Sequence, residues 1–214
     1  SRSNLGLWQE NFAVTLPQLV EAAAGNGSFS MTPDGDGLLR RIPILVGRRQ
    51  GRDKITDEQP LPGLALEALR VAAGTSIVKI IDTGPPEFKI DEIQFNARDA
   101  SGKKKKIVIP TDEKGNFIMY YAGKRDELYI PAWKILQGLV DASQIKGKIA
   151  FVGTSTIGLL DLRSTPLNSI LPGVEVHAEI VDQVLNRQFI LRSVNTRGTE
   201  GGITLVASLA IIFM

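Results

Sequence analysis

The sequence predicts one mixed α/β domain, with a central sheet flanked by helices and a strand-rich middle. Two observations favour this class: apolar residues recur at helical spacing towards both ends, and short apolar runs divided by turn-forming residues fill the middle. A third is continuity, since neither a repeat nor a linker divides the 214 residues. A chain of this length can bury one substantial core. We therefore expect a folded domain over residues 1–200 and a distinct apolar tail over 201–214.

The first part of the chain alternates helical and strand patterns. A helix is expected over 17–24 and another over 64–73, where apolar residues recur at helical intervals before Gly74. Between these helices, the turn-forming residues 33–37 lead into a strand within 40–49. Further strands are expected at 77–81, 87–90, 93–95, 106–109 and 117–121.

The later part of the chain has the order of an α/β unit. A short helix is expected over 131–141, and an apolar strand follows over 149–152. After a loop, an amphipathic helix is expected over 174–187. Because the run at 149–152 is apolar throughout, we expect this strand to be buried.

The composition excludes several classes of function. The chain has no Cys, which removes disulfides, thiol catalysis and cysteine zinc sites, and its one His, His177, excludes a multi-histidine metal site. Lys and Arg number 25 against 23 Asp and Glu, and these charges are spread along the chain. Nothing here indicates nucleic-acid binding. We expect no metal and no cofactor.

A candidate ligand site follows the expected buried strand. The run ends in Gly153, Thr154, Ser155 and Thr156, and ligands of open α/β sheets bind in crevices at the carboxyl ends of strands. A phosphate-binding P-loop is not present, because Leu159 stands where that motif requires Lys. The sequence therefore predicts a binding crevice without a nucleotide motif.

Three charged or titratable residues lie close to this loop in the sequence. Asp161 and Arg163 could hold a polar ligand, or they could pair with each other and cap neighbouring backbone. His177 falls on or beside the apolar face of the last predicted helix, where it is either a core residue or a pH sensor. A serine-hydrolase triad would need this histidine as its base, but no G-x-S-x-G motif is present. We expect no catalytic residue in this chain.

Two charged stretches have simpler interpretations. The acidic residues at Pro33–Gly37 do not continue as a calcium-binding loop, so a glycine-rich turn is expected there. The four lysines at 103–106 are expected to lie in a solvated turn, with attraction to anionic lipid as the alternative.

The two ends of the chain suggest a membrane context. Residues 201–214 carry no charge and are mostly apolar, but a membrane helix needs about 20 such residues. We expect the beginning of a truncated transmembrane helix, with a buried C-terminal helix or strand as the alternative. At the other end, Ser1 opens a polar stretch without a signal peptide, which is typical of a fragment of a longer protein.

Several separated motifs together resemble the second class of CHASE domain, the cyclase and histidine-kinase associated sensory extracellular modules of bacteria. The resemblance rests on DGDGLLRRIP at 34–43, on IPTDEKGNFIMYYAG at 109–123, and most strongly on the segment 147–185. These stretches occur in the family's order and span most of the chain from Asp34 to Leu185.

The resemblance implies an extracytoplasmic sensor domain, periplasmic or extracellular, held at the cell membrane by flanking helices. It also implies a cytoplasmic adenylate or guanylate cyclase or a histidine kinase in the same chain as the output of signal transduction. A ligand or environmental stimulus is implied but not identified, and a homodimer is expected from the symmetry common to such receptors. The alternatives are an extracytoplasmic hydrolase and a dimerisation module that binds no ligand.

Overall fold

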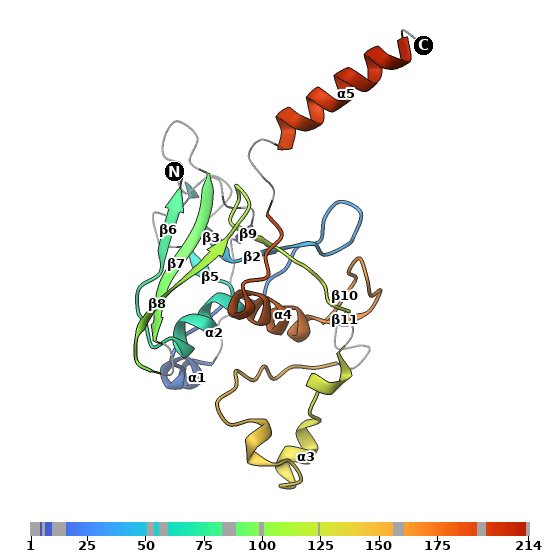
Figure 1. The fold of residues 1–214 in the computed structure, drawn as a ribbon. Coiled ribbons are helices and arrows are strands. Elements are labelled where there is room, and N and C mark those ends of the chain that lie inside the picture. The colour runs from blue at the N-terminus through green and yellow to red at the C-terminus, as the bar shows by residue number, and fades with distance from the viewer. Residues whose placement is uncertain are drawn as a thin grey trace.

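The computed structural model describes residues 5, 7–9, 16–50, 54–55, 60–82, 89–98, 101–123, 125–155, 161–191 and 196–212 (Figure 1). The helices are α1 (Pro17–Ala22), α2 (Leu64–Ala72), α3 (Ala132–Leu136), α4 (Gly173–Asn186) and α5 (Thr196–Ile212). The strands are β1 (Trp8–Gln9), β2 (Arg41–Pro43), β3 (Leu45–Gln50), β4 (Lys54–Ile55), β5 (Leu61–Pro62), β6 (Lys79–Asp82), β7 (Ile90–Arg98), β8 (Lys104–Pro110), β9 (Asn116–Ile118), β10 (Leu162–Arg163) and β11 (Leu171–Pro172). The mixed α/β class is confirmed.

The strands form several small sheets in place of the one central sheet that the sequence predicts. In the described residues, β3 pairs with β1, β4 and β5, β2 pairs with β9, and β10 pairs with β11. The antiparallel sheet β6–β7–β8 has the longest strands. Pro43 and Pro62 end short strands, and a proline cannot donate to a ladder, so the pairing cannot extend through them.

The sheet β6–β7–β8 has one buried and one polar face. Ile93 pairs with Ile109 and Phe95 pairs with Ile107, so these apolar side chains lie on one face. Ile93 and Ile109 are fully buried and Phe95 is nearly so. Alternate residues therefore face outward, and they include Gln94 and Asn96.

The core forms where this sheet, the sheet β2–β9 and the helices α2 and α4 meet. Helices α2 and α4 contact each other (Figure 1). The core includes Leu66 of α2, Phe117 of β9 and Ile180 of α4, which are buried almost completely. Burying such side chains stabilises the fold by about 1.5–3 kcal/mol each.

The expected turn at Pro33–Gly37 is confirmed, and the arginines that follow stabilise it. Arg40 donates two hydrogen bonds to the Asp36 carboxylate at 2.9 and 2.8 Å and one to Asp34 at 3.3 Å. Arg41 pairs with Asp34 at 2.9 Å. Gly37 has a φ of 82°, a value that glycine adopts without strain. The acidic residues thus stabilise a turn.

The predicted buried strand at 149–152 is wrong. Ile149 and Phe151 are half-buried against the core, but Val152 is 93% exposed and residues 149–155 belong to no strand. Only alternate side chains of this apolar run, those of Ile149 and Phe151, therefore pack on the core. Among the described residues no strand pairs with this segment, so it is an extended covering segment and not the centre of an α/β unit.

The tail forms α5, which extends away from the rest of the molecule (Figure 1). Residues 200–211 are all exposed, so the alternative of a buried C-terminal element is wrong. Across the described part of the chain, none of the helices combines the length and the apolar character needed to cross a membrane. The expected beginning of a membrane helix is therefore not supported by α5 as it stands.

Candidate functional site

Helix α4 carries or contacts several of the residues that the sequence predicts as ligand contacts. It begins at Gly173, directly after Pro172 in the N-cap position, and it carries Glu175 in its first turn, where a negative charge favours the helix dipole. It ends at Asn186, and the C-cap residue Arg187 adopts a left-handed conformation with a φ of 55°. Most of its residues are buried, which is unusual for an amphipathic helix.

The side chains of α4 form two adjoining faces. An apolar face carries Val176, Ile180 and Val184, four residues apart, and these side chains belong to the hydrophobic core. A polar face carries Glu175, Glu179, Asp182 and Gln183.

Several of the predicted site residues meet at the first turns of α4. Gly153 lies against Val174, since a Cβ at Gly153 would be 2.6 Å from the Val174 Cβ. Asp161 accepts a hydrogen bond from the Gly173 N–H at 2.7 Å through its backbone carbonyl. Arg163 and Asp161 form an ion pair at 3.4 Å. The structure thus brings together residues from 153, 161–163 and 173–174.

The other loop residues predicted as ligand contacts do not line an enclosed site. Thr154 and Ser155 are exposed, and Thr156 lies outside the described residues. Asp161 and Arg163 are each about one-third exposed, and their pairing with each other matches the simpler of the two interpretations. A ligand-binding role for these residues stays a prediction.

His177 is a buried core residue on α4. Its side chain is 3% exposed and its ring stacks on Phe151, with 6.5 Å between centroids and 19° between planes. Burial lowers the pKa of His177 to about 4, against the opposing effect of the Asp161 charge. The imidazole is therefore neutral near pH 7, and neither ring nitrogen has a hydrogen-bond partner among the described residues.

The polar face, which is absent from the residues predicted above, holds the segment 119–129 against α4. The Gln183 side chain bonds both backbone groups of Tyr120: Tyr120 N–H donates to Gln183 Oε1 at 3.1 Å, and Gln183 Nε2 donates to the Tyr120 carbonyl at 2.9 Å. Arg125 pairs with Asp182 at 3.2 Å. The Tyr129 hydroxyl donates to the Glu175 carboxylate. Three positions of α4 therefore anchor one segment.

Glu179 lies between these anchors and carries an unusual charge state. It is 2% exposed and its Oε2 atom has no hydrogen-bond partner in the part of the chain that the structure describes. Burial, and then the neighbouring Glu175 charge, raise the pKa of Glu179 to about 7, although Arg125 opposes the shift. Near neutral pH this carboxyl group is therefore close to its titration midpoint.

Tyr121 is a buried phenol whose pKa responds to the Glu179 charge. It is 8% exposed and its hydroxyl has no hydrogen-bond partner among the described residues. Burial and the Glu179 charge raise the pKa of Tyr121 well above the ordinary value, so the phenol stays protonated. The spacing of Glu175, Glu179 and Asp182 was a signal for this face, because positions i, i+4 and i+7 of a helix share one side.

The comparisons with known proteins identify the domain family. A family model described as "CHASE2 domain" matches residues 3–213, which is nearly the whole chain. No curated protein and no solved structure matches the chain significantly. The match agrees with the resemblance drawn from the motifs at 34–43, 109–123 and 147–185.

Proposed function

The chain belongs to the CHASE2 family of extracellular sensory domains, and from this membership we propose that it is the extracytoplasmic input domain of a bacterial membrane receptor. In this proposal the domain has no catalytic activity of its own. It passes a stimulus to a cytoplasmic cyclase or histidine kinase in the same polypeptide. The flanking segments attach it to the membrane, with α5 lying at the membrane end.

The observation that carries this proposal is the position of α4 in the chain and in the fold. Its apolar face is part of the core, its polar face anchors the segment 119–129, and residues 187–191 follow it on the way to α5. α5 is exposed and extends away from the domain (Figure 1). A change in how α4 is held would therefore reach α5 through a short connection.

A stimulus can act on such an arrangement only if it binds one state better than the other. The polar face provides a set of contacts that could differ between two states, because hydrogen bonds and ion pairs can be exchanged at small cost. The apolar face is a poor candidate for exchange, because close-packed cores resist small displacements.

Placement outside the cytoplasm is tested by thiol labelling of the full-length receptor in cells. Residues 1–214 contain no cysteine, so a cysteine introduced at the exposed Lys146 is the one thiol in this domain, and the receptor that keeps Lys146 is the control for thiols elsewhere. A membrane-impermeant maleimide is expected to label Lys146→Cys while the inner membrane is intact. Labelling only after lysis of the inner membrane would contradict the proposed location.

The signalling role is tested by the output activity of the full-length receptor. Arg125→Gln removes one anchor of the polar face, and it is expected to change the basal output by roughly twofold or more, because an anchor worth about 1 kcal/mol shifts a two-state equilibrium about fivefold. Lys146→Gln is the matched control and should leave the output unchanged. An unchanged output in Arg125→Gln, in a receptor with normal abundance, would contradict the role of α4.

A second candidate function, a dimerisation module without a ligand, is favoured by the exposed apolar side chains around α3. Trp133 is 53% exposed, Leu136 86% and Leu139 64%. Exposed apolar patches of this kind mark protein–protein contacts. Self-association that Leu136→Glu abolishes, together with failure of every ligand to stabilise the domain, would favour this function.

A further inference from the structure

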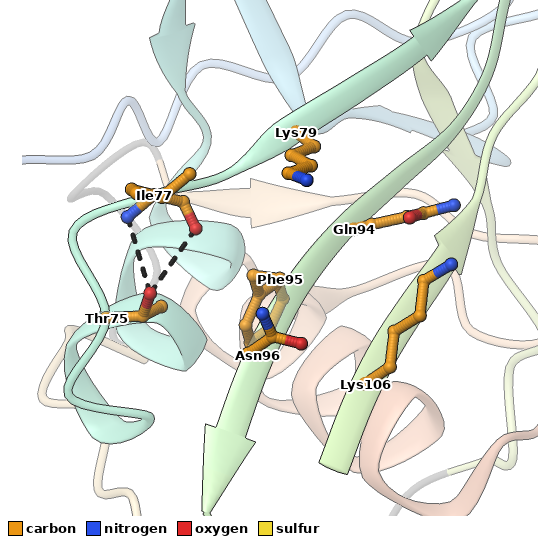
Figure 2. A pocket seen from close by; sticks show the side chains of 7 residues that line it. All are labelled: Thr75, Ile77, Lys79, Gln94, Phe95, Asn96 and Lys106. Atoms are coloured by element: carbon orange, nitrogen blue, oxygen red, sulfur yellow. Dashed lines mark hydrogen bonds between the residues drawn. The ribbon is translucent and has the colours of Figure 1, made fainter. Parts of the chain in front are cut away.

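The outer face of the sheet β6–β7–β8 carries a hollow that the sequence analysis did not predict (Figure 2). Its volume is about 480 Å³, and it lies where the sheet meets the segment that follows α2. The lining residues come from that segment and from all three strands: Thr75, Ile77, Lys79, Gln94, Phe95, Asn96 and Lys106. A hollow of this volume accommodates a small organic molecule.

The strand register explains why polar side chains gather there. Lys79 pairs with Gln94 across β6 and β7, and Asn96 pairs with Lys106 across β7 and β8. Gln94 and Asn96 are two residues apart, so all four side chains lie on the same face. Figure 2 shows that the four belong to three neighbouring strands and that Phe95 lies beneath them.

The lining of the hollow is positively charged. Two lysines line it and no acidic residue does. Neither Lys79 nor Lys106 has an ion-pair partner among the described residues, and both are exposed. The lining also offers the Gln94 and Asn96 amides, which can donate or accept hydrogen bonds. Thr75 is already engaged, since its hydroxyl bonds the backbone of Ile77 at 3.3 and 3.4 Å.

One carboxylate lies next to the hollow without lining it. Glu92 precedes Gln94 by two residues on the same face of β7 and accepts a hydrogen bond from the Gln94 side-chain nitrogen. This contact orients the Gln94 amide through its nitrogen, and the amide oxygen takes no part in it. The Glu92 charge also repels an anion in the hollow. Neutralising Glu92 is therefore expected to increase the affinity for an anion.

We propose that this hollow binds a small soluble dianion, either a dicarboxylate or a phosphate ester. The two ammonium groups of Lys79 and Lys106 come from opposite sides of β7, and two lysine charges match a charge of −2. Strands lie about 4.8 Å apart, and the two lysines lie opposite positions of β7 that are two residues apart, so their backbones are separated by roughly 12 Å. Two lysine side chains can bridge this span from either side of a small ligand. Ile77 supplies an apolar contact for its carbon skeleton.

In the proposed sensory function, a ligand of this hollow is the stimulus. Only the effect of binding on receptor output rests on that function. α2 ends at Ala72, and Arg70 of α2 donates a hydrogen bond to the Thr75 carbonyl at 2.7 Å. A ligand that contacts Thr75 and Ile77 is thus connected to α2, and α2 contacts α4. Binding itself is a property of the hollow and is tested without reference to any output.

The experiment is a titration of the 214-residue chain, isotopically labelled for NMR, with succinate and with inorganic phosphate, and with acetate as the monoanion. We expect saturable shifts at the backbone amides of Thr75, Gln94 and Asn96 with at least one dianion. Acetate should bind roughly tenfold more weakly or not at all, since it offers a single charge. The absence of saturable shifts with both dianions would overturn the proposal.

Charge variants test whether the named residues make the site. The double variant Lys79→Gln with Lys106→Gln is expected to weaken dianion binding by roughly tenfold or more, whereas Lys146→Gln with Lys148→Gln, an equal change of charge elsewhere, should leave it within about twofold. Glu92→Gln should tighten binding. Equal weakening in both double variants would overturn the proposal, because it would indicate attraction by net charge alone.

Vesicles distinguish a soluble ligand from a lipid headgroup. The chain, with α5 intact, is sedimented with mixed vesicles of phosphatidylglycerol and phosphatidylcholine and, separately, with vesicles of phosphatidylcholine alone. The mixed vesicles should recover no more of the chain than the phosphatidylcholine vesicles do. Recovery that depends on Lys79 and Lys106, without binding of either soluble dianion, would overturn the proposal in favour of a membrane contact. Binding of a dianion with no effect of the same variants on receptor output would leave the site standing and contradict its sensory role.

Discussion

The two faces of α4 are built from different interactions and should behave differently. The apolar face places Val176, Ile180 and Val184 in the core, where their side chains are at most 2% exposed. The polar face holds the segment 119–129 through a few hydrogen bonds and one ion pair, around the buried carboxyl group of Glu179. The comparison indicates that one face maintains the fold while the other can be altered without unfolding it.

The largest effect is expected on the apolar face. Ile180→Ala removes a fully buried side chain, so it should lower the free energy of unfolding by about 2–5 kcal/mol. Urea unfolding followed by circular dichroism measures this loss. Leu185→Ala, on the same helix but 51% exposed, is the control and should change stability by no more than about 0.5 kcal/mol. Equal losses in both variants would show that the apolar face is not the better packed one.

The next largest effect is expected at Glu179, and its sign depends on pH. The pKa of Glu179 in the folded chain is about 7, above the ordinary 4.5, so the folded state binds this proton more tightly than the unfolded state. The resulting stability is complete below about pH 4.5 and is lost as the pH rises through about 7. At about 1.4 kcal/mol per pKa unit, the loss amounts to no more than about 4 kcal/mol.

The variant Glu179→Gln tests this pH dependence. It should be more stable than the natural chain at pH 8, and the difference should shrink towards pH 5. His177 has the opposite dependence, because its pKa is lowered and stability falls as the pH drops from about 6.5 to about 4. The difference between the two chains at each pH is therefore the quantity to measure. The exposed Glu127→Gln is the control, and a constant difference across this pH range would contradict the assignment.

A smaller effect is expected from the hydrogen bonds of the polar face. Gln183→Ala removes both bonds to the Tyr120 backbone and should cost about 1–2 kcal/mol. Asn186→Ala, which removes one exposed bond to Asp182, is the control and should cost less. Chemical denaturation of both variants makes the comparison. A larger loss in Asn186→Ala would mean that Gln183 does not anchor the segment.

The smallest effect is expected at the start of α4, where the two faces meet the loop. Asp161 and Arg163 are about one-third exposed and 3.4 Å apart, so their pairing should contribute no more than about 1 kcal/mol. A double-mutant cycle of Asp161→Asn and Arg163→Gln measures this coupling. A coupling of several kcal/mol would indicate a buried role that the partial exposure does not support.

The elements that the sequence predicts best are those with strong local patterns. The helices α2 and α4 repeat their apolar residues at helical spacing and end near Gly74 and Arg187, and the structure confirms both. The strands β6, β7 and β8 were also expected, although the separate strands near 90 and 93 are one strand. Local propensity and tertiary packing agree in these elements.

The features that the sequence does not reveal depend on contacts between distant segments. The run at 149–152 has the composition of a buried strand, but whether it is paired depends on a neighbouring strand that composition cannot supply. The anchors of the polar face join residues that are 46 to 63 positions apart in the chain. The hollow depends on the register of three strands, which places Lys79 near Lys106. None of these relations has a local signature.

Native-state hydrogen exchange of two amides measures directly whether the two faces of α4 open separately. The Tyr120 N–H is bonded to Gln183 on the polar face, whereas the Val184 N–H lies within α4 among core residues. We predict that Tyr120 exchanges by local opening, with a free energy at least about 2 kcal/mol below that of Val184, which should exchange only through global unfolding. Equal exchange free energies at the two amides would mean that the faces open together, and this would contradict a polar face that opens without unfolding the core.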